Sequence, residues 1–150
     1  MKKVLLLVDD DRGERNLFNE AIQTIDPDIV YHAVEDGNKA FELLESITGN
    51  LPQVIFVDIN MPVMSGWVFL KTIKENKQLN HIPVIMYSTS NYQRDIDIAI
   101  ELGALCFCIK PESYKLLTKM IQVVSENLHG NLAEAIRHDQ TNLHNFRGLK

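Results

Sequence analysis

The chain has 150 residues, of which 45% are hydrophobic, and a formal net charge of −5. This length and apolar content fit one domain with a single buried core. Acidic and basic residues are interspersed, so the sequence lacks the positive stripe that binding to nucleic-acid phosphates requires. The apolar run after Lys3 ends at Val8, which is too short for a signal peptide or a membrane span, and we therefore expect a cytoplasmic protein that engages neither nucleic acid nor a membrane.

Short aliphatic segments alternate along the chain with segments of helical periodicity. We expect buried strands, apolar on both faces, at residues 4–8, 29–34, 54–57, 84–87 and 105–109. Apolar stripes of helical spacing lie within residues 17–25, 40–47, 67–73, 96–102 and 116–124. Asp11 is placed to cap the first helix, and Gly103 to end the fourth. Five strand-then-helix units without hairpin signals predict a doubly wound α/β domain, with a five-stranded parallel sheet covered by helices on both faces.

The composition changes near the C-terminus. From Gly130 onward the chain is polar and weakly patterned, with no further strand signal. We therefore expect residues 1–128 to form the domain and residues 129–150 to be an added helix or a partly ordered tail. The two cysteines, Cys106 and Cys108, lie in the last apolar strand, where small buried side chains are a simpler interpretation than metal ligands.

The residues just past the strand ends carry most of the chemistry that the sequence offers. In a doubly wound sheet, the binding site lies outside the carboxyl ends of the strands. These positions hold carboxylates, a hydroxyl and a lysine, namely Asp9, Asp10, Asp58, Ser88 and Lys110. We therefore expect these side chains to converge on one edge of the sheet.

This acidic edge needs a source of positive charge. Two carboxylates about 5 Å apart repel by roughly 3 kcal/mol at an effective dielectric constant of about 20, so three of them together require a counter-ion. Oxygen ligands without nearby His or Cys favour Mg²⁺. A carboxylate beside Mg²⁺, a lysine and a hydroxyl is suited to attack phosphorus and form an acyl phosphate. The sequence has no G-x-x-x-x-G-K-[ST] loop, so a nucleotide is not the evident phosphoryl donor.

In order, spacing and strand context, these motifs closely resemble the receiver domain of two-component response regulators. The resemblance covers about residues 3–128 and implies the flavodoxin-like strand order 2-1-3-4-5. It also implies a signalling switch and not a metabolic enzyme. Such a protein takes its phosphoryl group from a phosphohistidine on a sensor histidine kinase or phosphotransfer protein, promotes that transfer, loses the group slowly, and acts on a downstream protein.

The resemblance implies a role for each acidic residue. Asp58 would be the phosphoacceptor. Asp10, Asp58 and the main-chain carbonyl of Asn60 would bind Mg²⁺ directly, whereas Asp9 would act on the ion mainly through water. These assignments come from the family and not from spacing alone.

The resemblance also implies a switch. Ser88 and Lys110 would hold phosphoryl oxygens, and Phe107 occupies an aromatic position that turns inward when the hydroxyl is drawn toward the phosphate. Lys110-Pro111 falls where the family has a cis peptide bond, which would aim the lysine inward. The output would be a surface formed by the fourth helix, the fifth strand and the fifth helix.

Several positions depart from the common receiver pattern. Val63 and Ser65 stand in MPVMSG where Gly and Asp are usual, and Thr89 replaces a residue that is commonly alanine. Its branched side chain would narrow the approach to Asp58. Glu112, together with STS and NHIPVIMYS, resembles the small regulators that serve phytochrome-type kinases.

Two other functional classes use similar features. A phosphatase of the haloacid dehalogenase type also has an aspartate nucleophile and Mg²⁺, but its D-x-D motif ends the first strand, whereas Asp9 and Asp10 are adjacent and the isolated carboxylate is Asp58. A receiver fold that binds partners without phosphorylation is the second alternative. Apolar residues of the last two helices and of the tail also allow a homodimer.

Overall fold

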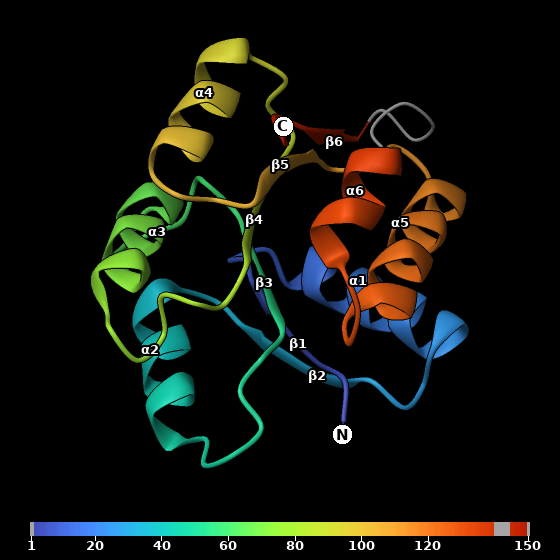
Figure 1. The fold of residues 1–150 in the computed structure, drawn as a ribbon, viewed down its shortest axis with the longest axis horizontal. Coiled ribbons are helices and arrows are strands. Elements are labelled where there is room, and N and C mark those ends of the chain that lie inside the picture. Colours follow the sequence, from blue (N-terminus) through green and yellow to red (C-terminus); the bar gives the residue numbers. More distant parts are fainter. Residues whose placement is uncertain (1, 140–144, 150) are drawn as a thin grey trace.

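Strands alternate with helices along the chain in the computed structural model, which describes residues 2–139 and 145–149 (Figure 1). The strands are β1 (Val4–Val8), β2 (Val30–Val34), β3 (Val54–Val57), β4 (Val84–Ser88), β5 (Cys106–Ile109) and β6 (Phe146–Arg147). The helices are α1 (Arg12–Ile25), α2 (Gly37–Ser46), α3 (Gly66–Glu75), α4 (Gln93–Glu101), α5 (Tyr114–Asn127) and α6 (Leu132–Asp139). The strands form one sheet in the order β2-β1-β3-β4-β5-β6. The first five are parallel, which confirms the predicted order 2-1-3-4-5.

Helices cover both faces of this sheet, as predicted. Helices α1, α5 and α6 lie on one face, and α2, α3 and α4 on the other (Figure 1). Successive residues of β1 point alternately into the two cores: Leu5 and Leu7 pack toward α1 and α5, whereas Leu6 and Val8 pack toward α2 and α3. This double burial explains why β1 is apolar throughout, and it fixes where the chain leaves the strand.

Strand β2 differs from the prediction of strands buried on both faces. Its residues are only partly buried, and Ala33 is exposed. The strand lies at the edge of the sheet and, among the described strands, pairs only with β1, so the helical layers cover it incompletely. The apolar content of its sequence did not reveal this edge position.

The C-terminal segment contains more structure than the sequence indicated. Helix α6 corresponds to the expected added helix, and its Ile136 is fully buried against α5. The expectation of no further strand is wrong, because β6 pairs antiparallel with β5 and buries Phe146 completely. A two-residue strand with one apolar side chain has no periodicity to detect. Residues 140–144 and 150 of the predicted extension lie outside the described residues, and the boundary after Leu128 stays a prediction.

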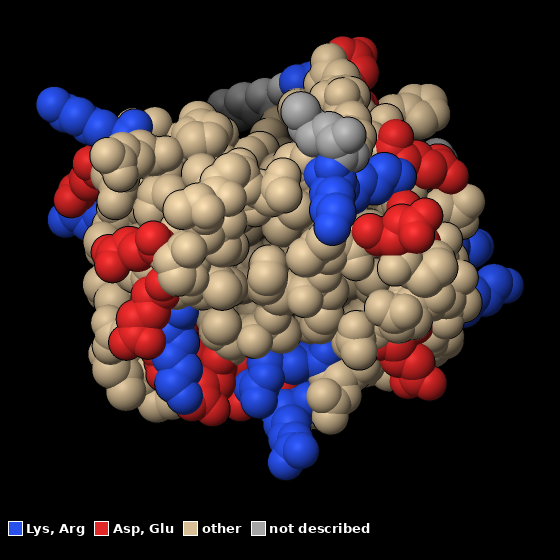
Figure 2. Space-filling model, turned by 90° about the horizontal axis from the view of Figure 1, so that it is seen from below, with Lys and Arg blue, Asp and Glu red and all other residues tan. Residues whose placement is uncertain are grey.

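Charges of both signs are distributed over the surface. On the face drawn in Figure 2, Lys and Arg alternate with Asp and Glu around the rim of a largely uncharged centre. This arrangement agrees with the interspersed charges of the sequence. Among the described residues, we find no helix with the length and hydropathy needed to cross a bilayer.

Candidate phosphorylation site

Neighbouring strands bring the three aspartates together. Asp9 follows β1, and Asp58 follows the adjacent β3. The amide of Asp58 donates to the carbonyl of Val8 at 2.9 Å, so the sheet ladder itself sets the two strand ends side by side. One carboxylate oxygen each of Asp9, Asp10 and Asp58 lies within 4.8 Å of the others. The predicted convergence of these side chains is therefore present in the structure.

Asp9 is fully buried and held from several directions. Its Oδ1 accepts from the amide of Asp11 at 2.9 Å, and its main-chain carbonyl accepts from Nη1 of Arg15 at 2.7 Å. Its Oδ2 accepts from Nζ of Lys110 at 3.0 Å. Asp11 in turn caps α1 by accepting from the amides of Gly13 and Glu14, which confirms its predicted capping role. The start of α1 thus fixes the most buried carboxylate of the group.

Lys110 supplies the positive charge that faces these carboxylates. Its Nζ lies 3.0 Å from Asp9 Oδ2 and 3.9 Å from Asp58 Oδ1, and 5.5 Å from the centre of the Tyr87 ring. Burial alone lowers the pKa of Lys110, but the carboxylates of Asp9 and Asp58 outweigh that effect and raise it. The ammonium group therefore stays protonated at neutral pH.

The expected cis peptide bond before Pro111 is wrong, because no peptide bond among the described residues is cis. The trans form is the lower in energy for X-Pro bonds by about 0.5–1 kcal/mol. The inward direction of Lys110 does not depend on it. The Lys110 amide donates to the carbonyl of Ser88 at 2.8 Å, which aligns the end of β5 with the end of β4 and places the lysine over the acidic edge.

The carboxyl group of Asp58 is buried beside other charged groups. Burial raises the pKa of its carboxyl to about 6, Asp9 and Asp10 contribute to the rise, and Lys110 and the amide of Ile59 oppose it. That amide donates to Asp58 Oδ1 at 2.9 Å. Burial is thus the main obstacle to ionising Asp58, and a cation bound at this edge would favour the ionised form.

The loop after β3 depends on a glycine whose role the sequence analysis did not recognise. Gly66, at the start of α3, donates its amide to the carbonyl of Ile59 at 2.8 Å. A Cβ atom at this position would lie 2.2 Å from the carbonyl oxygen of Asp58. Only glycine therefore fits behind the acidic residue, and the Ser-Gly pair before a helix was the available signal. Asn60 lies in the same loop and is exposed.

Ser88 and Phe107 lie inside the domain next to this edge. Ser88 ends β4 with 2% of its surface exposed, and its Oγ accepts from the amide of Ser90 at 3.2 Å. Phe107 is fully buried in β5 and pairs with Met86 of β4. The two residues therefore stand on adjacent strands, with the aromatic ring turned into the core.

The donor set at the acidic edge fits a divalent cation of the Mg²⁺ type. Asp9, Asp10 and Asp58 offer hard oxygen atoms within reach of one another, and Asp10 is exposed to solvent. An ion that keeps several waters can therefore be bound from the open side. Burial is the main cause of the raised pKa of Asp58, and the charges of Asp9 and Asp10 add to it, so a cation bound here would lower that pKa.

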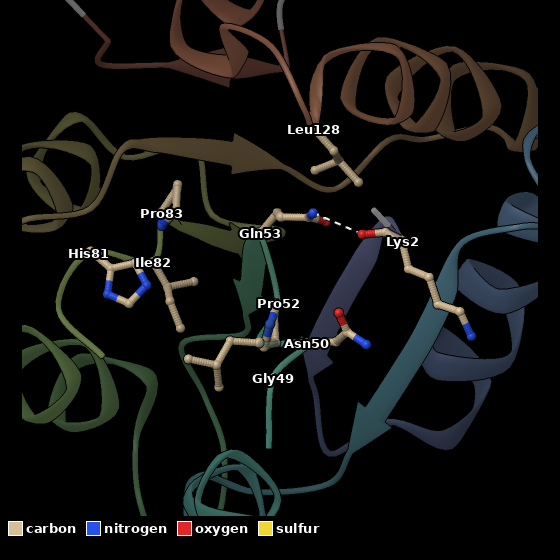
Figure 3. A pocket seen from close by; sticks show the side chains of 10 residues that line it. Lys2, Gly49, Asn50, Pro52, Gln53, His81, Ile82, Pro83 and Leu128 are labelled. Carbon is tan, nitrogen blue, oxygen red and sulfur yellow. Dashed lines mark hydrogen bonds between the residues drawn. The ribbon is translucent and has the colours of Figure 1, made fainter. Parts of the chain in front are cut away.

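A separate hollow lies at the opposite end of the sheet. A pocket of about 410 Å³ is bordered by Lys2, Gln53 and Pro83, which precede β1, β3 and β4 (Figure 3). Gln53 closes part of its wall by donating to the carbonyl of Lys2 at 2.9 Å and accepting from the amide of Val4 at 2.7 Å. None of the described residues that border this pocket carries a carboxylate, and none belongs to the acidic site.

Comparisons with known proteins identify the family. The profile of the response regulator receiver domain matches residues 5–122. The chain belongs to the response regulator receiver family. Receivers are two-component signalling proteins that histidine kinases or phosphotransfer proteins phosphorylate, and they are not conventional enzymes.

Individual relatives agree with this assignment. The response regulator Rcp1 of Synechocystis is 33% identical, over 80% of this chain and 84% of its own length. The Mn²⁺-bound structure of Rcp1 covers 83% of this chain and 92% of that one, with a TM-score of 0.71 and 31% identity. The phosphorylated cyanobacterial phytochrome response regulator RcpA has a TM-score of 0.75 and 27% identity, covering 84% of this chain and 93% of that one.

One solved receiver structure extends the likeness to the C-terminal segment. A response regulator in red light signalling of R. palustris covers 97% of this chain and 99% of that one, with a TM-score of 0.73 and 17% identity. At this identity the likeness concerns the fold alone.

The phytochrome response regulator RcpA, reported above, agrees with the resemblance to phytochrome-associated regulators noted in the sequence.

Proposed function

We propose that this receiver accepts a phosphoryl group on Asp58 from a phosphohistidine, in a Mg²⁺-dependent reaction. The observation that carries the proposal is the convergence of three carboxylates and Lys110 at one strand edge, with oxygen atoms of Asp9, Asp10 and Asp58 within 4.8 Å of one another. Further support comes from the relatives, since one was solved with bound Mn²⁺ and another in its phosphorylated form.

In this proposal Asp10, Asp58 and the main-chain carbonyl of Asn60 hold the ion, and Asp9 acts mainly through water. When bound, Mg²⁺ neutralises charge on the phosphoryl oxygens. An oxygen of the Asp58 carboxylate forms a bond to phosphorus while the bond from phosphorus to the histidine nitrogen breaks, and the electron pair stays on that nitrogen. The buried Asp9 accepts from Lys110 and holds it over the reacting edge until a phosphoryl oxygen replaces Asp9 as the acceptor.

Ser88 and Phe107 are the proposed switch. Ser88 would donate its hydroxyl to a phosphoryl oxygen, and Phe107 on the neighbouring strand would fill the space behind it. Phe107 already points into the core, so the element would respond through small shifts of β4 and β5. The downstream protein would read these shifts on the surface of α4, β5 and α5. A homodimer through α4, α5 and the residues after Leu128 stays a prediction.

The test is phosphoryl transfer from radiolabelled acetyl phosphate and from a phosphorylated histidine kinase, each with Mg²⁺. We expect one stable phosphoryl group per wild-type chain, none after chelation of Mg²⁺, and none on Asp58→Asn. Asp11→Asn is a matched control, because asparagine retains the helix cap and Asp11 is not assigned to the acceptor. Label that persists on Asp58→Asn would overturn the acceptor assignment, and steady turnover of a phosphatase substrate would favour the dehalogenase-type alternative.

A further inference from the structure

The C-terminal residues 145–149 run along β5, the strand that Lys110 follows, with Asn145 at the end nearest that lysine. Strand β6 pairs with β5 so that Arg147 stands opposite Phe107 and Phe146 opposite Cys108. Phe146 is fully buried, which anchors the segment in the core. The segment lies beyond residues 5–122, where the receiver profile matches. It therefore lies outside the common receiver core.

Asn145 holds the residue that precedes Lys110. The main-chain carbonyl of Asn145 accepts from the amide of Ile109 at 2.8 Å, and its side-chain Nδ2 donates to the carbonyl of Ile109 at 2.7 Å. Both polar main-chain groups of Ile109 are thus bound by a single residue. On the other side, the Lys110 amide is bound by Ser88. The backbone at the end of β5 is consequently fixed from two directions.

Gly148 fastens the other end of the segment to α4. Its φ of +85° favours glycine, and a Cβ atom there would lie 3.0 Å from side-chain carbons of Ile96 and of Ile100. Lys110, Asn145 and Arg147 also border a common pocket of about 390 Å³. The segment therefore forms one wall of a pocket that Lys110 also borders, while its end is packed on α4.

We propose that Asn145 is a positioning residue for Lys110, and that residues 145–149 act as a strap linking the α4 surface to the phosphorylation site. The inference rests on the proposed function. A lysine side chain is long and flexible, so its reach toward a phosphoryl oxygen depends on where the backbone holds its base. A partner that displaces the strap from α4 would release Ile109 and thereby change the rate of phosphorylation.

The first test replaces Asn145 with Ala and measures phosphorylation by acetyl phosphate with Mg²⁺. We expect a rate about two- to tenfold lower, as for loss of one hydrogen bond, and faster hydrogen exchange at the Ile109 amide. Asn127→Ala is a matched control, because Asn127 Nδ2 donates to the carbonyl of Val123 at the same 2.7 Å, on helix α5. In a Lys110→Ala background, Asn145→Ala should have no further effect on the rate, since it acts through that lysine.

The second test loosens the strap at its far end. Gly148→Ala should accelerate exchange at Ile109 and slow phosphorylation, whereas Gly49→Ala should do neither, because Gly49 has a similar φ of +100° with no atom within 4 Å of the added Cβ. Two results would overturn the positioning role alone, provided that wild type is labelled at Asp58. Asn145→Ala could leave the phosphorylation rate unchanged, or it could lower that rate by the same factor in the Lys110→Ala background. Wild type that takes no label would instead overturn the proposed function on which the inference rests.

Discussion

Ionising the Asp58 carboxyl destabilises the folded protein, and replacing Asp58 with asparagine should therefore raise the free energy of unfolding in a pH-dependent way. The pKa of Asp58 is raised from 3.8 to about 6 in the folded protein, chiefly by burial. A raised carboxyl pKa means that the folded state disfavours the ionised form, so the destabilisation is absent below the unfolded pKa and complete above the folded one. Asparagine carries no charge and retains an oxygen that accepts from the amide of Ile59.

The size of this effect follows from the two pKa values. We expect Asp58→Asn to be more stable than wild type by about 3 kcal/mol at pH 7.5 and by only about 1 kcal/mol at pH 4.5. Urea unfolding with a chelator present, at both pH values, measures the difference. Asp11→Asn is again the control, since it also replaces a carboxylate by an amide and the helix cap survives. A variant that is no more stable than wild type at pH 7.5, or a gap that is the same at both pH values, would refute the reasoning.

Three further substitutions test other parts of the site. Mg²⁺ at one hundred times its dissociation constant should raise the free energy of unfolding of wild type by about 2.7 kcal/mol, and that of Asp10→Asn by distinctly less. Equal gains for the two proteins in thermal melts would argue against Asp10 as a ligand. Gly66→Ala should destabilise the fold by at least about 2 kcal/mol and impair labelling, because its Cβ atom would lie 2.2 Å from the carbonyl oxygen of Asp58. Gly130→Ala, whose Cβ atom would meet open space, should be near neutral in urea unfolding. Val63→Gly should stabilise the fold by about 1 kcal/mol, since valine at a φ of 70° is strained and the residue is 83% exposed. A loss of stability in the same assay would show that the Val63 side chain makes stabilising contacts.

The acidic site was predictable because its position follows from local patterns. Strands such as β1 and β3 are short apolar runs, and the residue after each run must emerge at the carboxyl edge of the sheet. Parallel strands place Asp9 and Asp58 at the same edge, and the strand order that the receiver resemblance implies makes β1 and β3 neighbours. Ser88 and Lys110 followed from the same argument, and the distances at Lys110 confirm that it faces the carboxylates.

The remaining features depend on contacts that no local pattern records. Strand β6 is defined by its pairing with β5, and Asn145, just before β6, bonds Ile109 at a separation of 36 positions in the sequence. The two residues of β6 are too few to show a periodic pattern. The partial exposure of β2 follows from its edge position. The trans bond before Pro111 could not be read from the family pattern, because the inward direction of Lys110 is achieved through its bonds to Asp9 and Ser88.

The central claim is that Asp58, and not one of its acidic neighbours, receives a phosphoryl group at this edge. Borohydride converts an aspartyl phosphate into homoserine, so the acceptor can be located by peptide mass spectrometry after labelling with acetyl phosphate and Mg²⁺. We predict homoserine at position 58 and intact aspartate at positions 9 and 10. Homoserine at either of those positions, or at none of the three in protein that carries label, would contradict the account.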